Sequence, residues 1–402
     1  TSNSWEYTGD GFGMAYRAGA ELMDMEFTQF HPTGMVWPPS VRGTLVTEGV
    51  RGEGGILKNS EGKRFMFGYV PERFAPETAD TVEEAAKWLG GDKEARRPPE
   101  LLTRDVVARA IRAEVKAGRG SPHGGAFLDI ASQQPADFIK RKLPSMYHQF
   151  KELAEVDITA EPMEVGPTLH YYMGGIRVNA VTQMTNVPGL FAAGECGTGL
   201  HGANRLGGNS LSDLIVFGAR AGQGAKDYID ALSSRPKPDQ GHVNDIITDA
   251  MSFLDRDDGE NPYVVVDDVQ VAMEEHVGII REGPELEEGL EKLAALLERT
   301  KNVKAHATSQ YNPGWNTCLD LRNMLISAEA TARSALAREE SRGAHTRLDF
   351  EGEREEGLKY NCVIRRAADG SMELRKEPRP APPEELAKIA NASIEDLEAN
   401  RV

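Results

Sequence analysis

The sequence has few cysteines and lacks a long apolar run, and both features narrow the class of protein. Three cysteines occur among 402 residues, and Cys196, Cys318 and Cys362 are far apart with no CxxC pair. The chain alone therefore cannot build an iron–sulfur cluster or a zinc ribbon, and we expect no metal site. No window of about 18 apolar residues is present, so we expect no membrane-spanning helix.

Runs of basic residues are also missing. The chain has 46 Lys and Arg against 63 Asp and Glu, a formal charge of −17. Because an acidic chain without a basic patch binds phosphate backbones poorly, we expect no nucleic-acid partner. Hydrophobic residues make up 40% of the chain, as in ordinary globular proteins. At roughly 100–200 residues per domain, the length predicts about two to four domains.

Helix and strand patterns divide the chain into segments. A helix over 14–20 and a strand over 22–27 are interpreted as the end of an α/β unit. A helix over 105–116 belongs to a mixed, inserted segment. A strand over 189–193 and a helix over 211–223 resume the α/β pattern. The predicted domains are one α/β domain made of 1–27 and 169–234, an inserted domain over 28–168, and two further domains over 241–348 and 349–402.

Apolar stripes predict a helical bundle over 241–348, after a proline-rich linker over 235–240. Spacings of three and four residues place each set on one face of a helix, where we expect it to pack in the core. The two sets are Leu286, Leu290, Leu293 and Leu297, and Leu321, Leu325, Ala328, Ala332 and Ala335. A hairpin over 360–374 and a polar tail are expected in the last domain.

Several segments place chemically active side chains beside glycines, where backbone N–H groups can approach a ligand closely. Singly, each is explained as well by a structural histidine or an ordinary turn. Together, two histidines, two arginines and a threonine on one site would form a cage for a small dianion, because Arg pairs with a carboxylate through two bonds. The residues concerned are His31, Thr47, Arg104, His170 and Arg205.

Two further positions indicate a nucleotide. Glu195 directly follows an apolar strand, the position of an acid that binds a ribose. The run 210–213, Ser-Leu-Ser-Asp, is similar to a capping box that opens a helix after a glycine-rich loop. An ordinary helix cap and a solvated glutamate explain these two features equally well.

The motifs HPTG, TEGVRGEGG, TRDVVARAI, HYYMGG, GLFAAGE and HGANRLGGNSL occur in this order from residue 31 to residue 211. Their order and spelling resemble the flavoprotein subunit of succinate dehydrogenase and of quinol:fumarate reductase. The resemblance implies an FAD-binding α/β domain interrupted by a capping domain, then a helical bundle domain and a small C-terminal domain. The expected fold class is thus α/β plus α+β, with the FAD-binding domain incomplete.

The resemblance also implies roles for individual residues. Succinate would be oxidised to fumarate by hydride transfer to FAD, while Arg104 exchanges a proton with the substrate carbon and Glu48 and Arg51 conduct that proton to solvent. The residues matching the dicarboxylate contacts are His31, Thr47, His170 and Arg205. The residues matching the FAD contacts are Asp10, Glu195, Ser210 and Leu211.

Partners and location follow from the resemblance as well. Membrane anchor subunits and an iron–sulfur subunit would carry electrons to quinone, on the cytoplasmic face of a bacterial inner membrane. The GxGxxG turn and the flavin-tethering histidine of the family are not found in this sequence. We therefore expect it to be part of a longer subunit.

Three alternatives remain open from the sequence. The chain could serve a fumarate reductase working in the reverse direction, because the flavin and partner potentials set the direction. L-aspartate oxidase shares the HPTG motif but differs in the HYYMGG and RLGGN segments. A catalytically silent piece that only docks a partner subunit is the third.

Overall fold

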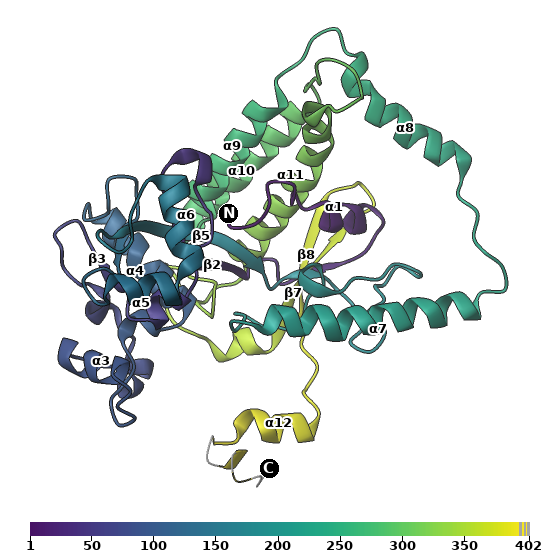
Figure 1. Ribbon diagram of the computed structural model, residues 1–402. Coiled ribbons are helices and arrows are strands. Elements are labelled where there is room, and N and C mark those ends of the chain that lie inside the picture. Colours follow the sequence, from purple (N-terminus) through teal and green to yellow (C-terminus); the bar gives the residue numbers. More distant parts are fainter. Residues whose placement is uncertain (394–395, 398, 400–402) are drawn as a thin grey trace.

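Two antiparallel sheets and a set of helices make up the computed structural model, which describes residues 1–393, 396–397 and 399 (Figure 1). One sheet has the order β2-β5-β4-β3, formed by Thr28–Met35, Met163–Tyr172, Ala126–Asp129 and Ile56–Lys58. The other has the order β6-β1-β7-β8, formed by Gly175–Ile176, Leu22–Met23, Tyr360–Arg366 and Met372–Pro378. The predicted fold class of mixed helical and sheet domains is confirmed.

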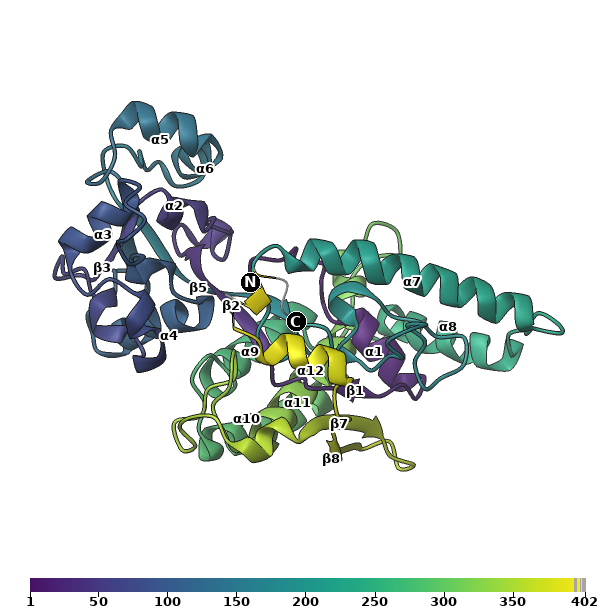
Figure 2. The ribbon, with the colours of Figure 1, turned by 90° about the horizontal axis from the view of Figure 1, so that it is seen from below.

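The first of these sheets and the helices around it form a separate lobe, which we call the cap (Figure 2). The chain enters the cap through β2 and leaves it through β5, whose last residues lie beyond the predicted boundary at 168. The helices of the cap are α2 Gly49–Gly52, α3 Val82–Leu89, α4 Arg104–Lys116, α5 Ala136–Lys142 and α6 Pro144–Ala154. The helix predicted over 105–116 is confirmed as α4.

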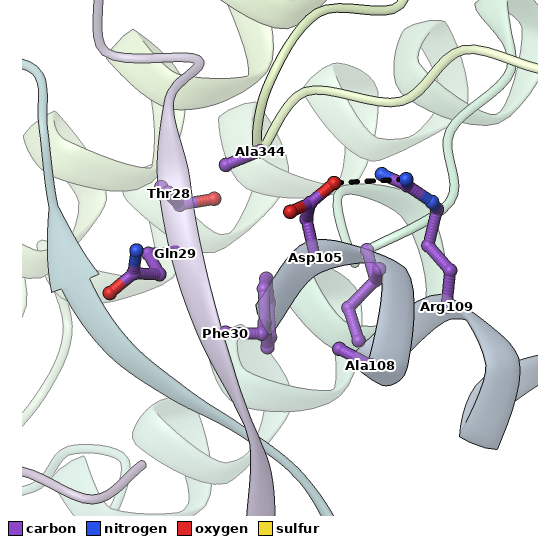
Figure 3. A pocket seen from close by; sticks show the side chains of 8 residues that line it. Thr28, Gln29, Phe30, Asp105, Ala108, Arg109 and Ala344 are labelled. Atoms are coloured by element: carbon purple, nitrogen blue, oxygen red, sulfur yellow. Dashed lines mark hydrogen bonds and ion pairs between the residues drawn. The ribbon is translucent and has the colours of Figure 1, made fainter. Parts of the chain in front are cut away.

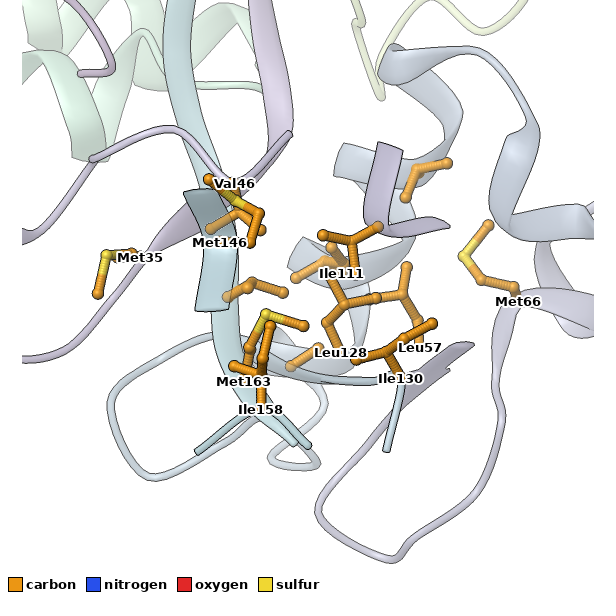
Figure 4. Close-up of a cluster of buried hydrophobic side chains, with 14 of the residues drawn as sticks. Met35, Val46, Leu57, Met66, Ile111, Leu128, Ile130, Met146, Ile158 and Met163 are labelled. Atoms are coloured by element: carbon orange, nitrogen blue, oxygen red, sulfur yellow. The ribbon is translucent and has the colours of Figure 1, made fainter. Parts of the chain in front are cut away.

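A single apolar core holds the cap together. Ile111 of α4 packs with Leu128 of β4 and Met163 of β5, and all three are fully buried (Figure 4). The apolar residues of α4 recur at helical spacing, so one face of the helix covers the sheet. Arg104, the first residue of α4, is fixed in space by this packing.

The opening segment differs from its prediction. Helix α1 spans Asp10–Arg17 instead of 14–20, and the predicted strand over 22–27 is only the two-residue β1. Asp24 takes a left-handed φ of 55°, and the N–H of Phe27 bonds to the carbonyl of Asp24. This turn ends the strand and directs the chain into β2.

Regular strand structure is also absent at 189–193, where the prediction was wrong. Phe191 forms one isolated bridge with Met184, and the chain then passes into a single 3-10 turn. The helix predicted over 211–223 is present but longer, as α7 Asn209–Ala231. Only Asp213 and Gly224 of α7 are buried, so most of this helix is exposed.

Helices α8 Gln240–Asp255, α9 Pro262–His276, α10 Gly283–Thr300 and α11 Pro313–Ala337 confirm the predicted helical region. The α11 stripe is buried as expected. On α10, Leu297 is 38% exposed and Leu296 is buried instead, because a period of 3.6 residues drifts away from strict spacings of three and four. In the described part of the chain, no helix is both long and apolar enough to cross a bilayer.

The predicted C-terminal hairpin is confirmed as β7 and β8. It does not stand apart, because β7 pairs with β1, with Leu22 opposite Ile364. Residues from the two ends of the chain therefore share one sheet. The remaining elements are α12 Glu384–Asn391 and the 3-10 helices Pro39–Val41, Met66–Tyr69, Glu72–Glu77, Pro99–Leu101, Gly194–Cys196 and Glu355–Leu358.

Two buried arginines join the root of the cap to the rest of the molecule. Arg281 donates to the carbonyl of Glu26 at 2.8 Å, to Thr28 Oγ1 at 3.0 Å and to His345 Nδ1 at 2.7 Å. Arg338 pairs with the Glu26 carboxylate, which burial would otherwise disfavour. Burial raises the pKa of Glu26 to about 7 even with Arg338 beside it. These bonds fix the point where β2 begins.

We predict that Ile111→Ala lowers the free energy of unfolding of the cap by about 2–5 kcal/mol, because it leaves a cavity in the core. Ile247→Ala on α8, a residue 54% exposed, is the matched control and should change stability by less than about 0.5 kcal/mol. Urea denaturation followed by circular dichroism measures both. Equal effects of the two variants would contradict the assigned core.

Candidate functional site

Arg104 lies between a carboxylate and an amide. Its Nε is 3.3 Å from Glu48 Oε2, and its Nη1 donates to Gln29 Oε1 at 3.1 Å. Glu48 is exposed and also lies 3.8 Å from Arg51 Nη2. The three residues predicted to move a proton therefore form one connected group, with Glu48 at its solvent end.

Arg51 is completely buried in α2. One nitrogen donates to the carbonyl of Glu100, whereas Nε and Nη2 have no hydrogen-bond acceptor among the described residues. Burial lowers the pKa of Arg51 to about 10; Glu48 opposes this shift and the charge of Arg104 adds to it. A buried guanidinium with free donors adjoins Arg104 and gives the site a local excess of positive charge.

Arg205 enters the same space from the loop before α7. Its Nη2 donates to Gln29 Oε1 at 3.1 Å, and its guanidinium lies 4.2 Å from the ring centroid of Tyr171. The Tyr171 hydroxyl is itself held, 3.2 Å from His201 Nε2 and 3.3 Å from Asp213 Oδ2. Burial, and then the charge of Arg104, lower the pKa of Arg205.

Two neutral histidines complete the group. The rings of His31 on β2 and His170 on β5 lie 5.4 Å apart, centroid to centroid. Burial, followed by the nearby charge of Arg104, lowers the pKa of His31 to about 2 and that of His170 to about 4. Both rings are therefore neutral at pH 7, so each can donate from only one nitrogen. His31 Nδ1 lies 3.0 Å from the carbonyl of Thr33, and His170 Nδ1 lies 2.8 Å from Ser2 Oγ.

Thr47 is the one predicted substrate contact without a direct link to this group in the described structure. Its side chain is exposed, and its hydroxyl accepts from the N–H of Gly49 at 3.3 Å. The preceding residue, Val46, is bonded to Thr33, two residues from His31. Thr47 thus lies on a segment that is hydrogen-bonded to the strand carrying His31.

Gln29 was not predicted from the sequence, although it contacts both Arg104 and Arg205. The sequence feature that could have marked Gln29 as a site residue is its position, two residues before His31 on the same strand. Tyr171, which supports Arg205, follows His170 directly and was likewise not singled out.

Two of the four predicted FAD contacts, Asp10 and Glu195, lie around a second region. Asp10, at the start of α1, and Glu195 line a cavity of about 1120 Å³ together with Gly11, Tyr172 and Cys196. Glu195 accepts from the N–H of Tyr172 at 3.0 Å. Carboxylates at element ends, in a cavity of this size, fit the ribose and ribityl hydroxyl groups of a dinucleotide.

The helix α7 begins differently from its prediction. Its N-cap is Gly208, with a left-handed φ of 84° and no side-chain cap, so no capping box is formed at 210–213. Ser210 lies inside the helix and accepts from Arg205 Nη1 at 3.3 Å. Leu211 is 65% exposed. Ser210 therefore contacts the arginine group, and the contact of either residue with FAD stays a prediction.

Comparison with known proteins decides the family. A model described as an FAD binding domain matches residues 1–211, and one described as fumarate reductase flavoprotein C-term matches residues 266–388. The chain is 44% identical to a subunit of the fumarate reductase (CoM/CoB) of Methanothermobacter marburgensis, over 87% of this chain and 58% of that protein. It is 38% identical to the succinate dehydrogenase flavoprotein subunit of Coxiella burnetii, over 93% of this chain and 61% of that protein.

The chain belongs to the succinate dehydrogenase and fumarate reductase flavoprotein family. A solved structure, Mycobacterium smegmatis Sdh1 in complex with UQ1, matches this flavoprotein with a TM-score of 0.82 and 50% identity. That match covers 99% of this chain and 62% of the Sdh1 chain. This flavoprotein sequence thus spans about three fifths of the length of these relatives.

The depressed histidine pKa values of this flavoprotein predict a pH-dependent stability. The native His170 ring takes up a proton only near pH 4, whereas the unfolded ring does so near pH 6.5. The unfolded state therefore binds more protons between these values, and stability falls as pH falls from about 6.5 towards 4. His170→Gln should reduce this slope, measured as the free energy of unfolding against pH; an unchanged slope would refute the neutral ring.

Proposed function

We propose that this chain provides the dicarboxylate site, and part of the FAD site, of an enzyme that oxidises succinate to fumarate. The observation that supports it best is the meeting of Arg51, Arg104 and Arg205 around neutral histidines, with a single exposed carboxylate, Glu48, among them. This group carries more positive than negative charge. A small dianion supplies the missing counter-charge.

Substrate binding would use the donors that have no fixed protein partner. Arg205 offers its Nε, which has no hydrogen-bond acceptor among the described residues, and the neutral rings of His31 and His170 each offer one ring nitrogen. Thr47 adds a hydroxyl from the neighbouring cap segment. Because both rings stay neutral, they bind through directed hydrogen bonds without adding further repulsion to the arginines.

Proton transfer is assigned to Arg104. A guanidinium group ordinarily holds its proton firmly, with a pKa above about 12. Exchange of that proton therefore requires a carboxylate held directly against Arg104. Glu48, 3.3 Å from Arg104 Nε and 48% exposed, would pass that proton between Arg104 and water.

FAD, when bound, supplies the hydride acceptor for the oxidation. Asp10 and Glu195 would hold its hydroxyl groups, and Ser210 and Leu211 would lie at its flavin end. The protein's contribution is to orient the substrate, exclude water beneath the cap and move the proton.

Partners and location belong to the same proposal. Three scattered cysteines offer no path for electrons, so membrane anchor subunits and a separate iron–sulfur subunit would receive them. This assembly would lie on the cytoplasmic face of a bacterial inner membrane, with the flavoprotein as its peripheral subunit.

Fumarate reduction is the second candidate, supported by the relative from Methanothermobacter marburgensis that is named as part of a fumarate reductase. The same residues would serve, with Arg104 donating the proton that it otherwise accepts. The choice depends on the electron partner, since one site catalyses both directions.

Anaerobic succinate should bleach the oxidised-flavin absorbance of the flavin-loaded complete subunit, and fumarate should restore it. Initial rates in the two directions, measured with the same assembled enzyme, separate the dehydrogenase from the reductase. A bound flavin that neither dicarboxylate affects would refute the proposed function and favour the silent docking piece.

Arg104→Gln should lower the turnover of succinate by about 10²–10⁴-fold, because it removes the proton acceptor. Flavin content should stay unchanged. Arg141→Gln, at an exposed position of α5, is the matched control and should retain normal turnover. Turnover of Arg104→Gln within about threefold of the wild type would rule out the proton-transfer role.

A further inference from the structure

Gln29 makes all the hydrogen bonds of which an amide side chain is capable. It is 1% exposed. Its Oε1 accepts from Arg104 Nη1 at 3.1 Å and from Arg205 Nη2 at 3.1 Å. Its Nε2 donates to Asn204 Oδ1 at 2.7 Å and to the carbonyl of Arg205 at 2.6 Å. Two lone pairs and two N–H groups are all used.

The surroundings fix which way the amide points. Nε2 faces two acceptors and Oε1 faces two cationic donors, so the reverse orientation would bring like groups together. Asn204 is held in turn by donating to Asp105 Oδ1 at 3.1 Å, and Asp105 pairs with Arg109 at 2.9 Å. Figure 3 shows this ion pair, with Gln29 on the opposite face of β2 from Thr28.

The two arginines that Gln29 joins come from different parts of the molecule. Arg104 opens α4 of the cap, whereas Arg205 lies in the loop before α7, outside the cap. Gln29 itself lies near the start of β2, where the chain enters the cap. Its amide oxygen therefore bonds to one residue of the cap and to one residue of the loop outside the cap.

The Gln29 side chain, which bonds to both arginines, carries no charge. A carboxylate of the same shape would form ion pairs with Arg104 and Arg205 and cancel charge that the substrate otherwise meets. An amide oxygen orients both groups through its dipole and leaves their full charge available. An apolar side chain of the same size would leave the charge but release both guanidinium groups.

We propose that Gln29 is a positioning residue that sets the relative placement of Arg104 and Arg205 while preserving their charge for a dicarboxylate dianion. This inference rests on the proposed function. Gln29 thus affects the orientation of the two arginines and the net charge around them. Two substitutions at this position alter these two properties independently.

The test compares Gln29→Glu and Gln29→Met in the flavin-loaded complete enzyme. Gln183→Met is the matched control, because Gln183 is also buried, at 4% exposure, but among the described residues its side-chain amide bonds to the carbonyls of Asn179 and Ala180 and to no arginine. Malonate affinity by calorimetry, kcat and KM for succinate, and the melting temperature are measured for each variant.

Gln29→Glu should weaken malonate binding by at least about tenfold and raise KM, because the introduced carboxylate competes with the dianion. Gln29→Met should keep malonate affinity within about threefold but lower kcat by about 10–100-fold, because Arg104 is no longer held in place. Gln183→Met should change neither parameter. If Gln29→Met does not fold, Gln29→Glu decides through malonate affinity read together with its melting temperature, which reports the loss of the two N–H bonds to Asn204 and the Arg205 carbonyl.

A purely structural role would lower the melting temperature of both Gln29 variants and change KM and kcat in parallel, which would overturn the inference. Normal kinetics in both variants would overturn it as well. If the wild-type enzyme itself neither binds malonate nor oxidises succinate, the proposed function fails and this inference fails with it.

Discussion

The buried junction of Arg281 and Arg338 with Glu26 is the constraint on which the rest of the structure depends. It joins two points of the helical region, the turn before α10 and the end of α11, to the residues just before β2. Desolvation makes two buried guanidinium groups unfavourable unless each is fully paired. The geometry that satisfies them therefore fixes where the cap begins, and with it the strand that carries Gln29 and His31.

From that anchored strand, the site is built by bringing positive charge together. The cap contributes Arg51 and Arg104, and the loop before α7 contributes Arg205. Burial, followed by the charge of Arg104, lowers the pKa values of His31 and His170, and burial lowers that of Arg51. Under the proposed function, a bound dianion would neutralise this group, so the excess positive charge of the free site would favour substrate binding.

The sequence predicted some parts of the molecule and not others. The helix that begins at Arg104 and the buried stripe of α11 followed from local periodicity, and the motifs that resemble the family identified the arginines and histidines. Arg281 meets Glu26 across 255 positions of the chain, which no local pattern records. The strand over 22–27 was broken by the left-handed turn at Asp24, and Gln29 carries no motif that marks it as a bridge.

A crystal structure of the flavin-loaded complete enzyme with malonate tests most directly whether Arg104 and Arg205 bind a dicarboxylate. One malonate should lie between the guanidinium groups of Arg104 and Arg205, within hydrogen-bond distance of His31 or His170, with Gln29 still bonded to both arginines. Malonate bound elsewhere, or these guanidinium groups turned away from an empty site at saturating malonate, would contradict that prediction.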